Sequence, residues 1–571
     1  MRSFALIIAL FGVVCADINL HNPRGSNNRL DENGRERSNA NRLFDSQNNN
    51  RGGHNVGNLY YYTGSHVQVQ WANQHSCGDM NNECELVLQY MCGDLVRDGT
   101  RRNTIPDNPN ACENKNCNTD TRFGMHEDYD YYNECRRRER NKGLFTADRL
   151  LRGITAKYTR QNNNGNRRGY ECPEERDYYP YWHPTPWRDI AIFTNNVTRC
   201  SMYTRESENV KDRYKCKVPE ELLKNSKFVI PNTKEACEKV TNAVWTSSQS
   251  HGLTAPECLP SPWSRDNHQG NAIGGEFMKY DWHVPDTPHE RCVFRIRYNI
   301  TTGDYPAWDP TTDYQRNSRP DIANAFYYQD KYDLKDSNGN RLSERHTRRR
   351  GYYYRNDPDV RIFADVPGFS LRIQINTNQD ARTFQDRSHT FAIRKRPSYL
   401  KSAKIHNVNV RGKRGNIVQV FPTTEYDFVP NSVTMKRNEY VHFQWTGSDT
   451  NPADNAGEGK AGTDRHNVLL LEGKAYPEAV SRPFTYGHWG RNYPMHLDNS
   501  SFLGLDRHDL QYLAISYPQS AISQNNEKLD YTGRYFDLGP RKVTKAGTFY
   551  YMCTRNNNFT NRSQKGRIVV K

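Results

Sequence analysis

The sequence predicts a mainly β protein, with a disulfide-rich β region in the first two thirds and a β-sandwich at the end. Three observations support this fold class. Apolar residues alternate with polar ones in several short runs, as Val67, Val69 and Trp71 do between glutamines, which is typical of half-buried strands. Twelve of the 14 cysteines lie between Cys77 and Cys292. Only 35% of the residues are hydrophobic, but 12% are aromatic, and each aromatic side chain buries a large area.

Residues 1–16 have the pattern of a secretory signal peptide. Arg2 precedes an uninterrupted apolar run over 4–14, and two small residues precede Asp17. The run is too short to cross a bilayer, which needs about 20 apolar residues, and no later segment approaches that length. We therefore expect a secreted, extracellular chain without a membrane span.

Residues 17–58 are poor in large apolar groups and rich in Asn, Arg and Gly. Such a segment buries too little apolar surface to offset the entropy lost when it becomes ordered. We expect it to be an arm, or to be held against a neighbouring region.

Residues 59–400 are expected to form the disulfide-rich β region, as one unit or as two subdomains. Alternation over 293–300 and 369–375 predicts two further strands, whereas residues 144–151 are one of few helix candidates. The strand-like runs stop before Pro397, so we place a domain boundary near residue 400.

The crowded cysteines predict up to six structural disulfides, because export places them in an oxidising compartment. They lack the Cys-x-x-Cys pairs of a zinc site, and their spacing leaves the pairing open. Cys553 lies far from the other cysteines in the sequence. Three roles are open for it: a buried free thiol, an intermolecular bridge or a ligand. The predicted framework cysteines are Cys77, Cys84, Cys92, Cys112, Cys117, Cys135, Cys172, Cys200, Cys216, Cys237, Cys258 and Cys292.

Five Asn-x-Ser/Thr sequons agree with export, and each predicts a surface loop if it carries a glycan. A chain this rich in asparagine also produces sequons by chance. The candidate glycosylation residues are Asn196, Asn299, Asn499, Asn558 and Asn561.

Residues 405–571 are expected to form a separate β-sandwich. Val441, Phe443 and Trp445 share one face of a predicted strand, and His442 and Gln444 share the other.

Three segments of this region resemble cupredoxins, the small Greek-key sandwiches that bind copper. They are Phe428-Val429-Pro430 with the strand over 441–445, then His466-Asn467-Val468, then the run over 547–553 that ends in Cys553. The resemblance covers the last third of the chain, and its histidine and cysteine follow the order of the family. It implies a cupredoxin-like Greek-key fold.

The cupredoxin copper site needs two imidazoles and a thiolate in one plane, with a weak axial ligand. His466 and Cys553 stand at matching positions and are the candidate metal ligands. The family then expects a second histidine soon after the cysteine, but residues 554–562 contain neither histidine nor methionine. We therefore favour a domain without copper or any other cofactor. A copper site completed by His488 or His496 is the alternative.

The whole chain also resembles an exported family of the DD-three-three type, found in slime moulds and invertebrate animals. The resemblance rests on residues 21–30 (HNPRGSNNRL) and 169–180 (GYECPEERDYYP), and on stretches that contain Trp445 and Cys553. It implies a secreted protein of developmental or matrix context, and it implies no particular reaction.

The formal net charge is +15, and arginine-rich runs contribute to it. Outside a cell the matching partners are acidic glycans and acidic cell surfaces, and export disfavours nucleic acid. One basic run lies beside a tyrosine cluster, where arginines could hold an anion and rings could stack on a sugar. A solvated basic face beside packed aromatics is the plain alternative. The candidate glycan-binding residues are Arg348, Arg349, Arg350, Tyr352, Tyr353 and Tyr354.

No Gly-x-Ser-x-Gly elbow, His-Glu-x-x-His motif or phosphate-binding glycine loop occurs in the sequence. We therefore interpret the chain as a secreted, non-enzymatic glycoprotein of extracellular matrix or cell-surface context that binds acidic glycans. The alternatives are a copper-binding or redox protein using the C-terminal domain and a secreted hydrolase with an unrecognised site.

Overall fold

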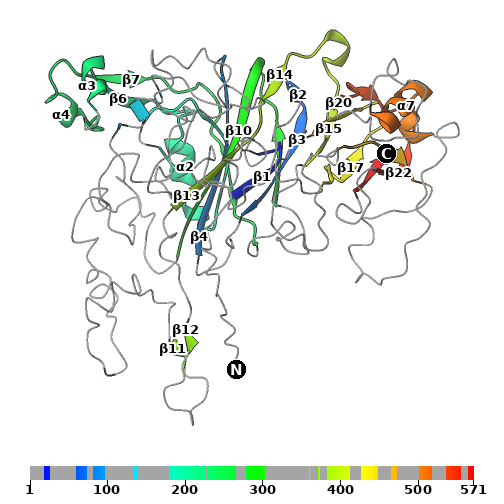
Figure 1. The fold of residues 1–571 in the computed structure, drawn as a ribbon, viewed down its shortest axis with the longest axis horizontal. Helices are drawn as coiled ribbons and strands as arrows, with labels where there is room; N and C mark the ends of the chain where they lie inside the picture. Colours follow the sequence, from blue (N-terminus) through cyan, green and yellow to red (C-terminus); the bar gives the residue numbers. More distant parts are fainter. Residues whose placement is uncertain are drawn as a thin grey trace, which may run out of the picture.

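The computed structural model is mainly β, as the sequence predicts, and its helices are short (Figure 1). The residues that the structure describes are 18–25, 59–73, 77, 82–94, 96, 131, 134–135, 137–138, 179–181, 183–225, 228–264, 278–302, 338, 359–360, 371–372, 382–411, 426–447, 465–471, 501–516, 535–554 and 564–571.

A seven-stranded sheet forms the centre of the disulfide-rich region (Figure 1). Its longest strand, β10 (His289–Thr302), includes the predicted strand and pairs antiparallel with β4 (Asn82–Cys92) and β14 (Phe391–Arg394). The remaining strands are β5 (Arg188–Thr194) and β8 (Glu257–Pro260) beyond β4, β2 (Leu59–Tyr62) beyond β14, and β13 (Arg382–Arg387) beside β10.

An eight-stranded sheet runs through both halves of the chain. β3 (His66–Asn73) pairs antiparallel with β1 (Ile18–Asn22) and β9 (Met278–His283), and through a single residue pair with β15 (Ile405–Val410). β15 in turn pairs parallel with β18 (Tyr440–Thr446). The strands that complete this sheet are β16 (Phe428–Val429), β20 (Tyr535–Asp537) and β21 (Arg541–Lys542).

The C-terminal strands form a β-sandwich, as the sequence predicts, and one of its two layers is joined to the N-terminal region through the single residue pair between β3 and β15. Their second layer is a four-stranded sheet that is flanked by the helix α7 (Arg507–Ile515) and the short turn η12 (Phe502–Gly504). The strands of this layer, in spatial order, are β17 (Ser432–Met435), β23 (Lys565–Val570), β22 (Gly547–Met552) and β19 (Leu469–Leu470).

Each region has its own hydrophobic core. The predicted inward residues Val67 and Trp71 of β3 join Phe294 of β10 in the first core. In the second core, Phe443 of β18 contacts Tyr551 of β22 edge to face, with ring centroids 5.8 Å apart. Alternation in the sequence thus predicts which residues of β3 and β18 enter the cores, although His442 and Gln444 on the other face of β18 are also buried.

Buried hydrogen bonds join the two regions where β2 and β3 approach β15 and β18. The Tyr60 backbone N–H donates to Gln444 Oε1 at 3.1 Å, and Gln444 Nε2 donates to the Tyr60 carbonyl at 2.6 Å. The Asn407 side chain donates to the His66 carbonyl at 2.8 Å. Because unpaired buried amides are costly, these contacts fix how the two regions meet.

The face of β10 opposite the first core carries buried arginines. The guanidinium carbons of Arg295 and Arg387 lie 4.0 and 4.7 Å from the ring centroid of buried Trp187, within cation–π range. Arg295 Nε also donates to Gln89 Oε1 of β4 at 2.9 Å. This layer combines the buried arginines with apolar side chains, since Met91 and Val293 pack with Trp187.

A small cystine-linked unit lies at the end of the molecule opposite α7 (Figure 1). It consists of the hairpin β6 (Arg213–Lys217) and β7 (Val244–Ser248) with two short helices, α3 (Glu220–Lys224) and α4 (Lys234–Cys237). The remaining elements are η5 (Val197–Arg199), α2 (Cys200–Glu206), β11 (Asp359–Val360), β12 (Leu371–Arg372) and η8 (Ser398–Leu400).

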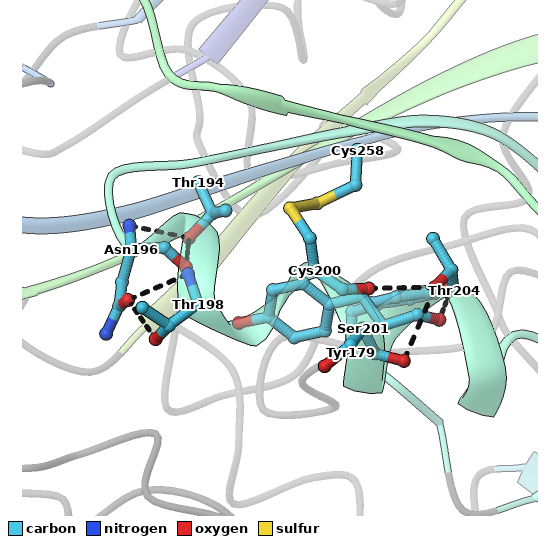
Figure 2. Close-up of a disulfide and its surroundings, with 9 residues drawn as sticks. Tyr179, Thr194, Asn196, Thr198, Cys200, Ser201, Thr204 and Cys258 are labelled. Carbon is cyan, nitrogen blue, oxygen red and sulfur yellow. Dashed lines mark hydrogen bonds between the residues drawn. A yellow bond between two sulfur atoms is a disulfide. The ribbon is translucent and has the colours of Figure 1, made fainter.

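Eight of the predicted framework cysteines form four disulfides, and Figure 2 shows the one that ties α2 to β8. Cys135 is also disulfide-bonded. The four pairs are Cys77–Cys84, Cys92–Cys292, Cys200–Cys258 and Cys216–Cys237. The predicted framework cysteines outside the described residues are Cys112, Cys117 and Cys172.

Part of the predicted arm over 17–58 is a buried strand. Ile18 and Leu20 of β1 are at most 1% exposed and enter the first core beside β3. The signal peptide, the arm beyond Gly25 and the helix predicted over 144–151 lie outside the described residues. Within the described ranges, no helix has the length and apolar character needed to cross a membrane.

Candidate metal centre

The strand pairing brings the two candidate metal ligands to one end of the second core. His466 precedes β19, Cys553 directly follows β22, and these antiparallel strands pair Leu469 with Met552. Counting outward from that pair places the residues just before β19 opposite those just after β22. The strand pairing thus brings together two residues that lie far apart in the sequence, the mid-domain histidine and the late cysteine.

Reciprocal hydrogen bonds between Asn467 and Thr554 hold the two loops together. The Asn467 side chain donates to Thr554 Oγ1 at 2.8 Å, and the Thr554 N–H donates to Asn467 Oδ1 at 2.8 Å. Asn467 also donates to the Ala514 carbonyl at the end of α7. Sequence reasoning missed both residues, although each directly follows a candidate ligand.

Both ring nitrogens of His466 have partners from the protein. Nε2 lies 3.4 Å from Nη2 of Arg24, and Nδ1 lies 3.2 Å from Oε1 of Gln564. A guanidinium can only donate, so Nε2 must be the acceptor and Nδ1 must carry the proton. The Nδ1–H group of His466 then donates to the amide oxygen of Gln564. The two contacts together indicate the neutral tautomer that is protonated at Nδ1.

Arg24 reaches this site from the turn that follows β1. It is 2% exposed, its Nε lies 3.4 Å from the Val410 carbonyl, and its guanidinium lies 5.6 Å from the Tyr426 ring centroid. A residue from the start of the chain therefore contributes to the site of the C-terminal domain. No local pattern in the sequence indicates this, because 442 positions separate Arg24 from His466.

Aromatic rings enclose the imidazole of His466, which is fully buried. The centroids of Tyr426 and Trp445 lie 5.1 and 6.3 Å from its ring centroid, both edge to face. These rings exclude water, so the hydrogen bonds to Arg24 and Gln564 matter more than they would at a surface.

Cys553 is buried and is not disulfide-bonded within the chain. Its backbone N–H donates to the Gln564 carbonyl at 2.9 Å. Gln564 therefore holds the cysteine with its main chain and the histidine with its side chain.

Two family models match the chain. The model of the DD3-3 N-terminal domain matches residues 16–393, and that of the DD3-3 cupredoxin-like domain matches residues 403–570. The chain belongs to the DD3-3 family. Both resemblances found in the sequence are thereby confirmed. No curated protein sequence matches the chain.

Two solved structures are similar to part of this DD3-3 chain. One is auracyanin A, a "blue" copper protein from the green thermophilic photosynthetic bacterium Chloroflexus aurantiacus, at 14% identity over 29% of this chain and 99% of that chain, with a TM-score of 0.13. The other is auracyanin B, at 13% identity over 31% of this chain and 93% of that chain, with a TM-score of 0.13. The cupredoxin-like assignment rests on the family model.

The described residues of the DD3-3 chain do not fit a mononuclear copper centre, which needs two free imidazole nitrogens and a thiolate. His466 offers no free lone pair in the assigned tautomer, and His488 and His496 lie outside the described residues. Where the structure is described, three potential ligand groups converge only at Asp506, His508 and Asp509. That cluster includes neither His466 nor Cys553.

The acidic cluster at α7 has structural roles. Asp506 Oδ1 accepts the Asp509 N–H at 2.8 Å and so caps the helix. The Asp509 carboxylate accepts both contacts of Arg541 Nε, at 2.8 and 2.9 Å.

The predicted glycosylation residues fall into three groups. Asn196 begins η5 near the Cys200–Cys258 bridge, where its Oδ1 accepts hydrogen bonds from Thr198 N and Oγ1 at 3.2 and 2.5 Å (Figure 2). The next residue, Val197, is 52% exposed, so this sequon lies at the surface. The predicted residues outside the described ranges are Asn499, Asn558 and Asn561.

The predicted glycan at Asn299 is contradicted by the fold. Asn299 is 1% exposed in the middle of the seven-stranded sheet, and its side chain donates to Glu85 Oε1 at 2.8 Å. A glycan needs a surface position, so this sequon is one of those that arise by chance. The predicted glycan-binding residues over 348–354 lie outside the described residues.

Proposed function

We propose that the chain is a secreted, non-enzymatic glycoprotein of the extracellular matrix or cell surface that binds acidic glycans. In this proposal the cupredoxin-like domain is a metal-free scaffold that anchors the start of the mature chain. The observation that carries it is the use of both His466 ring nitrogens, one by Gln564 and one by Arg24.

The charge of Arg24 adds to this argument. A guanidinium is permanently protonated, so a cation already lies beside the imidazole on which a metal would have to bind. Replacing that contact by a metal would require the loss of a buried charge-assisted hydrogen bond and the displacement of β1 from its neighbours. The arrangement therefore favours a structural role for His466.

Export is supported by the sequence of residues 1–16 and by the disulfides. Cytosolic thiols are kept reduced, whereas secreted domains retain bridges such as the four described here. Glycan binding is supported by the formal net charge of +15, because a basic extracellular protein attracts acidic polysaccharides.

The test is metal analysis of the full chain purified from the medium of secreting cells, before and after incubation with copper. We expect less than one tenth of a copper ion per chain, and no visible absorption from a copper–thiolate bond. One copper per chain that is lost in Cys553→Ser, with intact folding, would contradict the scaffold and establish the alternative of a copper-binding redox protein.

A further inference from the structure

A cavity of about 60 Å³ lies beside the β6–β7 hairpin. Its volume is roughly four to six times the minimum that one water needs. Its walls come from β6, from His183 and Pro184, from residues 230–232, and from Tyr131, Glu134 and Arg138. It lies at the opposite end of the molecule from α7, so it is independent of His466 (Figure 1).

One wall of the cavity is an exposed aromatic platform. Tyr214 is 50% exposed, and its ring is parallel to that of Trp245 within 4°, with centroids 6.2 Å apart. Both rings belong to the β6–β7 hairpin, which the disulfide between Cys216 and Cys237 links to α4. A flat ring fixed in this way presents an apolar face on which the C–H face of a sugar ring can pack.

The charged side chains of the cavity have a net positive charge. Arg138 and Lys215 line it together with one carboxylate, that of Glu134. Lys215 Nζ forms an ion pair with Glu134 Oε2 at 2.8 Å. The Arg138 guanidinium lies 5.8 Å from the ring centroid of Tyr131, which also lines the cavity. A carboxylate ligand suits this pair of cations, because arginine binds carboxylates through paired N–H groups.

Asn232 requires the ligand to be a hydrogen-bond donor as well. Its side-chain oxygen is buried on the cavity wall and meets no donor among the described residues. A buried acceptor without a donor costs free energy, so a ligand hydroxyl here would be favourable. Inorganic phosphate offers mainly acceptors at neutral pH, whereas a sugar acid carries both hydroxyls and a carboxylate.

We propose that this cavity binds an acidic sugar residue of an extracellular glycan. The carboxylate lies against Arg138 and Lys215, a hydroxyl donates to Asn232 Oδ1, and the ring packs on Tyr214. This inference rests on the proposed glycan binding and names its ligand class and its site.

The test is calorimetric titration of the full secreted chain with a hyaluronan tetrasaccharide, whose glucuronic acids carry the carboxylates, and with the same tetrasaccharide after carboxyl reduction. We expect the acidic form to bind at least tenfold more tightly. Tyr214→Ala should weaken binding roughly fivefold to tenfold, as expected for one aromatic contact. Asn232→Asp should weaken it by at least tenfold, because the added negative charge cancels the net positive charge of the cavity lining and repels the ligand carboxylate.

Matched controls separate the cavity from general charge and folding. Lys215→Gln should weaken binding, whereas Lys217→Gln removes the same charge from an exposed position on the same strand and should not. Tyr399→Ala, at a 64% exposed tyrosine elsewhere, should also bind normally. Thermal unfolding of each variant checks that it is folded.

The outcomes distinguish the two proposals. If the chain binds the acidic tetrasaccharide but Tyr214→Ala and Asn232→Asp bind it equally well, the cavity is not the site, although glycan binding stands. Equal binding of the carboxyl-reduced form would overturn the acidic ligand class. If the chain binds no acidic glycan at all, both proposals fail.

Discussion

The N-terminal region, from β1 to β14, and the C-terminal domain, from β15 to β23, each enclose an aromatic β core, but they are stabilised by different means. All four described disulfides lie between Cys77 and Cys292, whereas Cys553, the cysteine in the described part of the C-terminal domain, is not disulfide-bonded within the chain. The first region has long insertions between its strands, and cross-links limit the entropy of the unfolded chain most where such loops are long. The second region relies on close aromatic packing and on Arg24 from the first.

The largest effect that would break this comparison is loss of the Cys92–Cys292 bridge. It closes a loop across 200 positions, so the double variant Cys92→Ala/Cys292→Ala should lose about 5 kcal/mol of stability in the first region. Removing the Cys77–Cys84 bridge, which spans 7 positions, should cost only about 2 kcal/mol. Urea unfolding monitored by tryptophan fluorescence measures both, and equal losses would refute the loop-length explanation.

The aromatic core of the C-terminal domain should be nearly as sensitive to one truncation. Phe443→Ala leaves a cavity beside Tyr551 and Phe502 and should cost about 3–5 kcal/mol. Differential scanning calorimetry should show the C-terminal transition lowered while the other transition is unchanged. Dithiothreitol should lower the other transition more than the C-terminal one, and equal falls of the two transitions on reduction would contradict the contrast.

Loss of Arg24 tests the dependence of the second region on the first. Arg24→Ala leaves the buried His466 Nε2 without its donor and should destabilise the C-terminal domain by about 1–3 kcal/mol. The matched control is Arg205→Ala, whose side chain is 70% exposed and whose loss should change stability by less than about 0.5 kcal/mol. Calorimetry of both variants would disprove the link if they unfold alike.

A smaller effect should come from the pH dependence of a buried carboxyl group in the first region. Burial raises the pKa of Glu208 to about 8, although the Thr185 N–H donates to its carboxylate. The folded chain then holds a proton that the unfolded chain releases, so stability should fall as pH rises from 7 to 8 by about 1 kcal/mol. Denaturant midpoints at several pH values measure this, and Glu208→Gln should flatten the dependence. A rise in stability over that window would show that the sign is wrong.

Local sequence patterns predicted the features that residues close together in the sequence determine. Alternation identified the core-facing residues of β3 and β18, and the crowding of cysteines indicated the disulfide framework. Alternation could not show that β1, from a segment poor in apolar residues, would be buried, because its partner strand supplies the stabilisation. It also could not exclude the sequon at Asn299, whose burial depends on neighbouring strands.

The candidate site was predictable only in part. The order of histidine and cysteine identified His466 and Cys553, and the missing second histidine argued against copper. The contacts of Arg24 and Gln564 were not predictable, because they join positions up to 442 residues apart. Those contacts decide the chemistry, since they determine which nitrogen of His466 carries the proton.

The most direct measurement is the nitrogen chemical shifts of the His466 ring in a chain labelled with ¹⁵N-histidine, assigned with a His466→Gln variant. We predict the neutral tautomer with the proton on Nδ1, unchanged by one equivalent of copper(I). A proton on Nε2, or a shift of the Nδ1 resonance on addition of copper(I), would contradict the metal-free scaffold.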